Sequence, residues 1–307
     1  STDEPAGIVV QAYDSSPLAP DVTKVVEGRD ADLEVGLAAL KKLTDGHVHV
    51  CVREGVQWGH LMKDGIRVDH FGGPHPSGTA GFSIHKLCPA GPNRTVWHVG
   101  VQDVADIGRL LRDGKRPTER VVALTGPVAK APKLVRTRPG ADVGALCEGE
   151  FEAEQVRLVN GSAVWGTTAS VDGHTAFLGR WNTQVTMLED GVKRDLLGWV
   201  FPISGRYTQT NTVFDKFFRK VFKYDTDTNG SLRAIVPIGQ YEAVMPMDVL
   251  ATQLIKALAS KDLESAEKLG VLELAEEDLA LCQVVDPSKV PITDWLRDML
   301  TTIEKEG

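Results

Sequence analysis

The sequence lacks several features that would assign its class at once. Its longest candidate for an apolar span, LLGWVFPI at 196–203, is far shorter than the roughly 18 residues that cross a bilayer. Basic residues are outnumbered, 34 against 42 acidic ones, which leaves a net charge of −8. Because nucleic acids and anionic lipid surfaces both need a basic face, we expect no nucleic-acid partner and no direct membrane insertion.

Cysteine is scarce and lacks metal-binding spacing. The four residues Cys51, Cys88, Cys147 and Cys282 form no CxxC pair. This argues against an iron–sulfur cluster, a zinc knuckle and a secreted disulfide scaffold, and favours a reducing cytoplasm. The acidic run ELAEEDLALC at 273–282 is typical of a solvated helix face that ends in an ordinary buried thiol.

The remaining composition is that of an ordinary folded chain. Of 307 residues, 42% are apolar and 25% charged, enough for two or three domains. In the first part, apolar strands alternate with amphipathic helices, and Asp30 is the predicted N-cap of the first long helix. Strands are expected at 7–13, 47–52, 66–71, 95–100 and 120–126, and helices at 30–43 and 102–111. Such alternation is typical of a mostly parallel, doubly wound sheet.

The pattern changes twice after residue 126. Residues 127–205 hold short β-rich runs punctuated by Gly and Asp, which predicts a small β domain of β-grasp-like type. Helices dominate 206–307, with two expected at 248–260 and 262–270 and a last one behind a Thr293 cap. Four apolar residues at helical spacing predict the buried face of that last helix: Leu296, Met299, Leu300 and Ile303.

The stretch FGGPHPSGTAGF at 71–82 follows the expected strand IRVDHF, at the carboxyl end where α/β sheets bind ligands. Its glycines, Gly72, Gly73, Gly78 and Gly81, fit neither GxGxxG nor GxxxxGK(S/T). Its two prolines remove N–H donors that a phosphate-binding loop would use. Two interpretations stay open: a phosphate site, and a turn that needs glycine for positive φ.

Histidines supply further candidate ligands. His47, His49 and Cys51 share one face of the strand at 47–52 and are all zinc-ligand types, although no other converging ligand is identifiable. His85 and His98 stand alone in apolar company, where a histidine is more often a hydrogen-bonded structural residue than a ligand. No metal site is predicted.

The run DTDTNGSLRAIV at 225–236 imitates a calcium-binding EF-hand loop. Asp225, Asp227, Asn229 and Gly230 match, but the twelfth position needs a bidentate Glu and holds Val236. An Asp/Asn-Gly turn explains these residues. Because no Ser-His-Asp triad, paired carboxylates or nucleophile elbow occurs, no catalytic residue is predicted.

Eight ordered runs carry a family resemblance along almost the whole chain. They are FGGPHPSG (71–78), VWHVGVQDV (96–104), RVVALTGP (120–127), LVRTRPGA (134–141), FLGRWNTQV (177–185), VPIGQYEAVMPMD (236–248), LELAEEDLALC (272–282) and LRDMLTTIEKEG (296–307). In these runs the sequence resembles the NqrA family, the first of the six subunits of the bacterial Na⁺-translocating NADH:quinone oxidoreductase (Na⁺-NQR). The resemblance is to the C-terminal two thirds of that family, whose members begin with a further domain.

The resemblance implies a peripheral subunit on the cytoplasmic face of the bacterial inner membrane, held there by partner subunits that include integral membrane proteins. The complex is a respiratory Na⁺ translocase that passes electrons from NADH through flavins and iron–sulfur centres to a quinone such as ubiquinone. Family members resemble the NADH- and FMN-binding subunit of complex I. On that basis we expect a Rossmann-like domain at 1–126, a β-grasp-like domain at 127–205 and a mainly helical domain at 206–307.

Two departures bear on cofactors. Where the family usually has a second cysteine after the ALC run, this chain has Asp286, which weakens any proposal of cysteine-pair chemistry at Cys282. The CxxC motifs of the related Rnf-type subunit are also missing. We therefore expect no iron–sulfur centre or other cofactor in this chain, with quinone as a possible ligand.

The loop at 71–82 lies where complex I relatives hold flavin phosphate, yet its prolines and spacing indicate a decayed site. We hypothesise that the chain no longer binds FMN or NADH, is inactive when isolated, and contributes to quinone binding or docking. The alternative is an autonomous flavin- or NAD-dependent reductase. The candidate ligand residues are Gly72, Gly73, His75, Ser77, Gly78, Gly81, His85 and His98.

Overall fold

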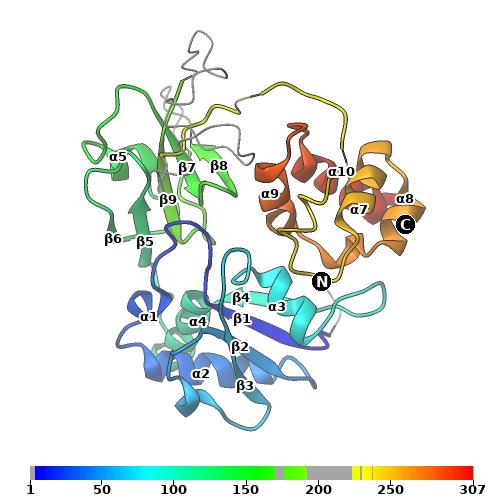
Figure 1. Ribbon diagram of the computed structural model, residues 1–307. Coiled ribbons are helices and arrows are strands. Elements are labelled where there is room, and N and C mark those ends of the chain that lie inside the picture. Colours follow the sequence, from blue (N-terminus) through cyan, green and yellow to red (C-terminus); the bar gives the residue numbers. More distant parts are fainter. Residues whose placement is uncertain (1–3, 170–175, 192–222, 229, 237, 307) are drawn as a thin grey trace. The chain divides into compact units, whose positions relative to one another are not determined.

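The computed structural model describes residues 4–169, 176–191, 223–228, 230–236 and 238–306 (Figure 1). By its contacts the chain divides into two compact units. Unit 1 combines residues 1–121 with 232–307, and unit 2 comprises 122–231. None of the helices in these described ranges is long and apolar enough to cross a membrane.

Unit 1 contains a parallel sheet of four strands in the order β3-β2-β1-β4. The strands are β1 (Ile8–Ala12), β2 (Val48–Arg53), β3 (Ile66–Phe71) and β4 (Trp97–Gly100). The chain steps outward from β1 to β3 and then returns to the other side of β1. The order therefore reverses between β1 and β4, and the β3–β4 connection crosses β2 and β1.

Helices and a 3₁₀ turn connect these strands. They are α1 (Val22–Val25), α2 (Asp30–Lys41), η1 (Gly59–Leu61), α3 (Ala80–Leu87) and α4 (Val101–Asp113). Helices α2 and α4 approach closely because Gly36 and Gly108 lack side chains: a Cβ on Gly108 would lie 1.7 Å from the carbonyl oxygen of Asp32. Leu33, Leu37 and the strand valines form the core beneath them.

The C-terminal part of unit 1 is helical, as expected. Its elements are α7 (Ala251–Ser260), α8 (Leu263–Lys268), η2 (Val271–Glu273), α9 (Glu276–Val285) and α10 (Ile292–Glu306). They enclose a second core around Leu254, Leu279 and Leu296. Phe82 of α3 also packs against this second core, and Figure 1 shows α3 beside the sheet and the C-terminal helices. Helix α3 thus belongs to both parts of unit 1.

Unit 2 is built on a five-stranded sheet in the order β6-β5-β9-β7-β8. The strands are β5 (Arg120–Thr125), β6 (Lys133–Thr137), β7 (Val156–Gly161), β8 (Gly166–Ala169) and β9 (Gln184–Glu189), with a short helix α5 (Val143–Cys147). Strand β5 runs parallel to β9, whereas β7 is antiparallel to β8 and β9. Val122, Leu158, Val185 and Met187 contribute to its core.

Three details of the sequence prediction are wrong. The strand expected at 120–126 forms, but it pairs with β9 in unit 2 and does not join the parallel sheet, because an apolar run does not specify its neighbour. Arg29, not Asp30, is the N-cap of α2. Thr293 lies inside α10, where its N–H and hydroxyl both donate to Gln283 Oε1 at 3.0 Å. The mixed α/β class with a helical end is confirmed.

Candidate functional site

The glycine loop, defined as residues 72–81, connects β3 to α3 and is held by the end of β1. Gln11 Nε2 donates to the Gly78 carbonyl oxygen at 2.6 Å, and the Gly78 N–H donates to Ser15 Oγ at 2.7 Å. The Tyr13 hydroxyl donates to the Gly73 carbonyl oxygen at 3.4 Å. Polar groups of the loop are therefore bonded within the protein, at the edge where the strand order reverses.

The loop glycines serve mostly for close approach. Only Gly73 among the four has positive φ, at 113°. A Cβ on Gly78 would lie 2.5 Å from the Ser15 nitrogen, and one on Gly81 would lie 2.1 Å from Asp278 Oδ2. Protein atoms thus fill the space beside two of the glycines. The turn interpretation accounts for Gly73, while packing accounts for Gly78 and Gly81.

His75 is the candidate histidine that lies in this loop. Its Nδ1 is 3.1 Å from Ser15 Oγ, which already accepts the Gly78 N–H. Ser15 therefore donates its hydroxyl proton to Nδ1, so the ring proton resides on Nε2. Burial lowers the pKa of His75, although Asp14 opposes the shift, so the ring is neutral at pH 7. The buried Nε2 has no hydrogen-bond partner in the described structure.

Acidic residues of α9 face the other side of the loop and were missed by sequence analysis. Asp278 and Glu276 are only 3% and 7% exposed, so the solvated face predicted for 273–282 is wrong at these positions. Burial raises the pKa of Asp278 to about 6 and that of Glu277 to about 8, where repulsion from Asp14 and Asp278 adds to the shift. The carboxyls turn inward because α9 packs on α3.

His85 and His98 have different environments. At the end of α3, His85 Nδ1 lies 2.9 Å from Glu273 Oε2, and its Nε2 accepts the Asp248 N–H at 3.1 Å. Both ring nitrogens are therefore engaged, as expected for a structural histidine. His98 is exposed on β4. Of the eight candidate residues, six thus lie in the glycine loop, and these two histidines lie outside it.

The residues considered as metal ligands have protein partners. His49 Nδ1 bonds Asp69 Oδ2 at 2.8 Å, and Arg67 donates to His47 Nε2 at 2.9 Å. Asp225 accepts the Asp227 N–H at 3.0 Å, as in the turn expected there. Within the described ranges, no three or more His, Cys, Asp or Glu residues form a group suited to a metal ion.

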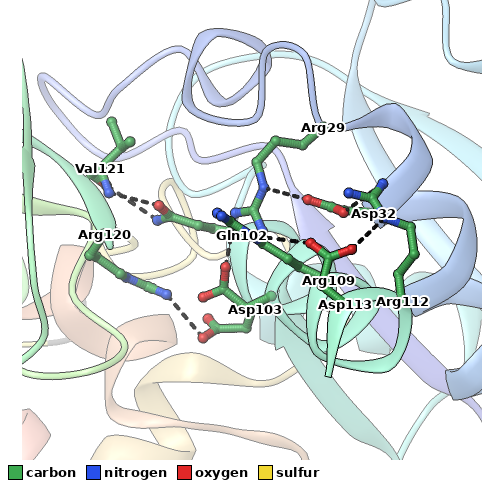
Figure 2. A network of polar contacts seen from close by, with 10 residues as sticks. Arg29, Asp32, Gln102, Asp103, Arg109, Arg112, Asp113, Arg120 and Val121 are labelled. Atoms are coloured by element: carbon green, nitrogen blue, oxygen red, sulfur yellow. Dashed lines mark hydrogen bonds and ion pairs between the residues drawn. The ribbon is translucent and has the colours of Figure 1, made fainter. Parts of the chain in front are cut away.

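A second buried polar network joins α2, α4 and the start of β5 (Figure 2). Arg120 Nη1 lies 2.9 Å from Asp103 Oδ1, and both residues are buried. The Gln102 side chain pairs with the Val121 backbone in both directions, donating to its carbonyl at 3.2 Å and accepting its N–H at 2.7 Å. Because these groups bond one another, the network fixes the chain where unit 1 ends at residue 121.

The comparisons with known proteins agree on one family. Residues 1–116 match the NqrA second alpha/beta domain, and residues 121–171 match the NQRA C-terminal domain. The NqrA protein of Hahella chejuensis (strain KCTC 2396), named for the Na(+)-translocating NADH-quinone reductase, is 47% identical over 305 residues. That alignment covers 99% of this chain and 68% of the relative. The protein of the same name from Serratia proteamaculans (strain 568) is 44% identical over 304 residues, with 99% and 67% covered.

Proposed function

Since this chain belongs to the NqrA family of Na(+)-translocating NADH-quinone reductases, we propose that it supplies such a pump with a quinone contact or docking surface and does not oxidise NADH. It is a subunit of a Na⁺-pumping NADH:quinone oxidoreductase. It acts peripherally on the cytoplasmic face, bound to partner subunits that include integral membrane proteins. It holds no flavin, iron–sulfur centre or metal of its own.

One observation carries the proposal: the glycine loop is filled from within. Ser15 takes the Gly78 N–H, and Asp278 lies against Gly81. A nucleotide phosphate in such a loop would need free N–H donors and open space beside the glycines. The strand order 3-2-1-4 matches half of a doubly wound dinucleotide-binding sheet. We therefore interpret residues 1–126 as a Rossmann-like frame without its nucleotide, beside the β-grasp-like and helical domains proposed at 127–205 and 206–307.

His75 is the group best suited to a quinone oxygen. A quinone site needs an apolar pocket with a few hydrogen-bond donors that converge on the carbonyls. The neutral ring carries its proton on Nε2, which lacks a partner within the described residues. A quinone carbonyl that reaches this nitrogen would satisfy it. His85 offers no such donor because both of its nitrogens are engaged.

The test is isothermal titration of the purified chain with FMN, NADH and a short-chain quinone, each alone. We expect one-to-one quinone binding and no heat from either nucleotide. His75→Ala should weaken quinone binding about tenfold, the loss of one hydrogen bond. The matched control His98→Ala removes an exposed ring and should change the affinity less than about twofold.

The other outcomes decide between the alternatives. Stoichiometric FMN or NADH binding, with NADH oxidation by an artificial acceptor, would replace the proposal with the autonomous reductase. Silence from all three ligands would remove the quinone contact and leave docking, which co-purification of the chain with the membrane subunits would then test. Equal losses in both histidine variants would remove His75 from the site.

A further inference from the structure

Helix α3 begins against a carboxylate that comes from a distant part of the chain. Thr79 is the N-cap of α3, and its hydroxyl donates to Asp278 Oδ1 at 3.1 Å. The other oxygen, Asp278 Oδ2, accepts the Ala275 N–H at 2.9 Å. Both carboxylate oxygens are therefore bonded, one to α3 and one to the start of α9.

The start of α3 has the features of an anion position. Thr79 Oγ1 accepts the Phe82 N–H at 3.3 Å, while the N–H groups of Ala80 and Gly81 have no acceptor among the described residues. Unpaired first-turn N–H groups and the helix dipole make this end electropositive. Gly81 lets the carboxylate lie on the first turn, since any Cβ there would be 2.1 Å from Asp278 Oδ2. Glycine allows the same approach by phosphates in nucleotide-binding loops.

We propose that the Asp278 carboxylate is a built-in anion that occupies, at the start of α3, the position a ligand phosphate takes in nucleotide-binding α/β proteins. The carboxylate excludes external anions and holds α9 on the carboxyl edge of the parallel sheet. This goes beyond the proposed function, because it is independent of any quinone contact. Although burial raises the pKa of Asp278 to about 6, the group is mostly ionised at pH 7.

Other contacts keep this carboxylate in place. Phe82, one turn into α3, packs on the core of the C-terminal helices. At the far end of α3, His85 bonds Glu273 and the Asp248 N–H. An external anion could reach the start of α3 only after α9 had left it. The arrangement is therefore an autoinhibitory contact between the helical part and the ligand edge of the sheet.

Chemical rescue of the full 307-residue chain tests the proposal. Asp278→Ala removes the carboxylate and leaves a space that fits formate, the same functional group. We expect about 100 mM sodium formate to raise the melting temperature of this variant by about 2–4 °C over sodium chloride of equal ionic strength. The wild type should show no such shift, because its site is filled.

Two further variants make the result decisive. Asp262→Ala removes another helix-capping aspartate, one that is exposed at the start of α8, and should show no formate effect. Asp278→Asn keeps the side-chain shape and should fold but not respond to formate, since the amide still fills the site. If Asp278→Ala does not fold in chloride, its refolding yield in formate becomes the measurement. Absence of a formate-specific gain, or an equal gain in Asp262→Ala, overturns the proposal.

Discussion

Glu277 shows how strongly one buried side chain can couple stability to pH. The pKa of this carboxyl rises from an ordinary 4.5 to about 8, chiefly through burial and further through Asp14 and Asp278. The folded chain therefore binds a proton more tightly than the unfolded chain does. The free energy of unfolding should be highest below about pH 4.5, as far as this group is concerned, and should fall as pH rises to about 8.

Glu277→Gln should remove that decline. At pH 8 the variant should be more stable than the wild type by about 1–2 kcal/mol, a figure reduced for partial exposure of the side chain. At pH 4.5 the two should be equal. Urea denaturation across this pH range is the measurement, with the exposed Glu267→Gln as the matched control. Parallel pH curves for wild type and Glu277→Gln would contradict the assignment.

The four cysteines should be inert in the folded chain. All four are buried, and burial raises the pKa of Cys51, Cys147 and Cys282 to about 12. Because the thiolate is the reactive form, iodoacetamide at pH 8 should leave the native chain unlabelled. Mass spectrometry should find four labels after denaturation in urea and none before. Rapid native labelling of Cys282 would reopen thiol chemistry at that position.

Among the elements, α3 is held by residues that follow it by more than 160 positions, as with His85 and Asp248. His85→Ala removes two hydrogen bonds from the end of α3 and leaves Glu273 without this partner. We expect a loss of about 1–3 kcal/mol in the free energy of unfolding. Replacement of the exposed His98 by Ala should cost less than about 0.5 kcal/mol. Equal effects in urea denaturation would show that the α3 contact is not stabilising.

The same elements show what the sequence could predict. Strand β3 has the expected bounds, 66–71, because its residues alternate locally and a glycine-rich loop ends it. The sheet that contains β5 could not be predicted, since pairing with β9 depends on residues 60 positions away. The pattern of strands did predict that the glycine loop follows β3 at the carboxyl edge of the sheet.

The rest of the candidate site follows from tertiary contacts. Polar residues at the end of β1, in the run QAYDSS, carried a usable signal, because parallel strands bring their carboxyl ends together. Gln11, Tyr13 and Ser15 could have been predicted on that basis. The Thr79–Asp278 bond had no local signal, because the periodicity of α9 does not identify the helix that packs on it.

The molecule as a whole has separate cores in its two units. A Cβ on Gly108 would meet the Asp32 backbone in unit 1, and one on Gly126 would lie 2.1 Å from the Met187 carbonyl oxygen in unit 2. If the units unfold separately, calorimetry should show two transitions. Gly108→Ala should lower one and Gly126→Ala the other, each by roughly 5 °C or more.

Gly59→Ala is the control for both substitutions. No atom lies within 4 Å of a Cβ at this position, so the melting temperatures should hardly change. A single transition lowered equally by Gly108→Ala and Gly126→Ala would show that the chain unfolds as one cooperative unit.

The placement of α3 also sets an order of events during synthesis. Thr79 and Asp278 are 199 residues apart, so a ribosome adding about 5–20 residues per second needs roughly 10–40 s between them. During that interval the parallel sheet has emerged, while Phe82 still lacks the core it packs against. A nascent chain halted before residue 248 would therefore present this face of α3 to chaperones or to other nascent chains.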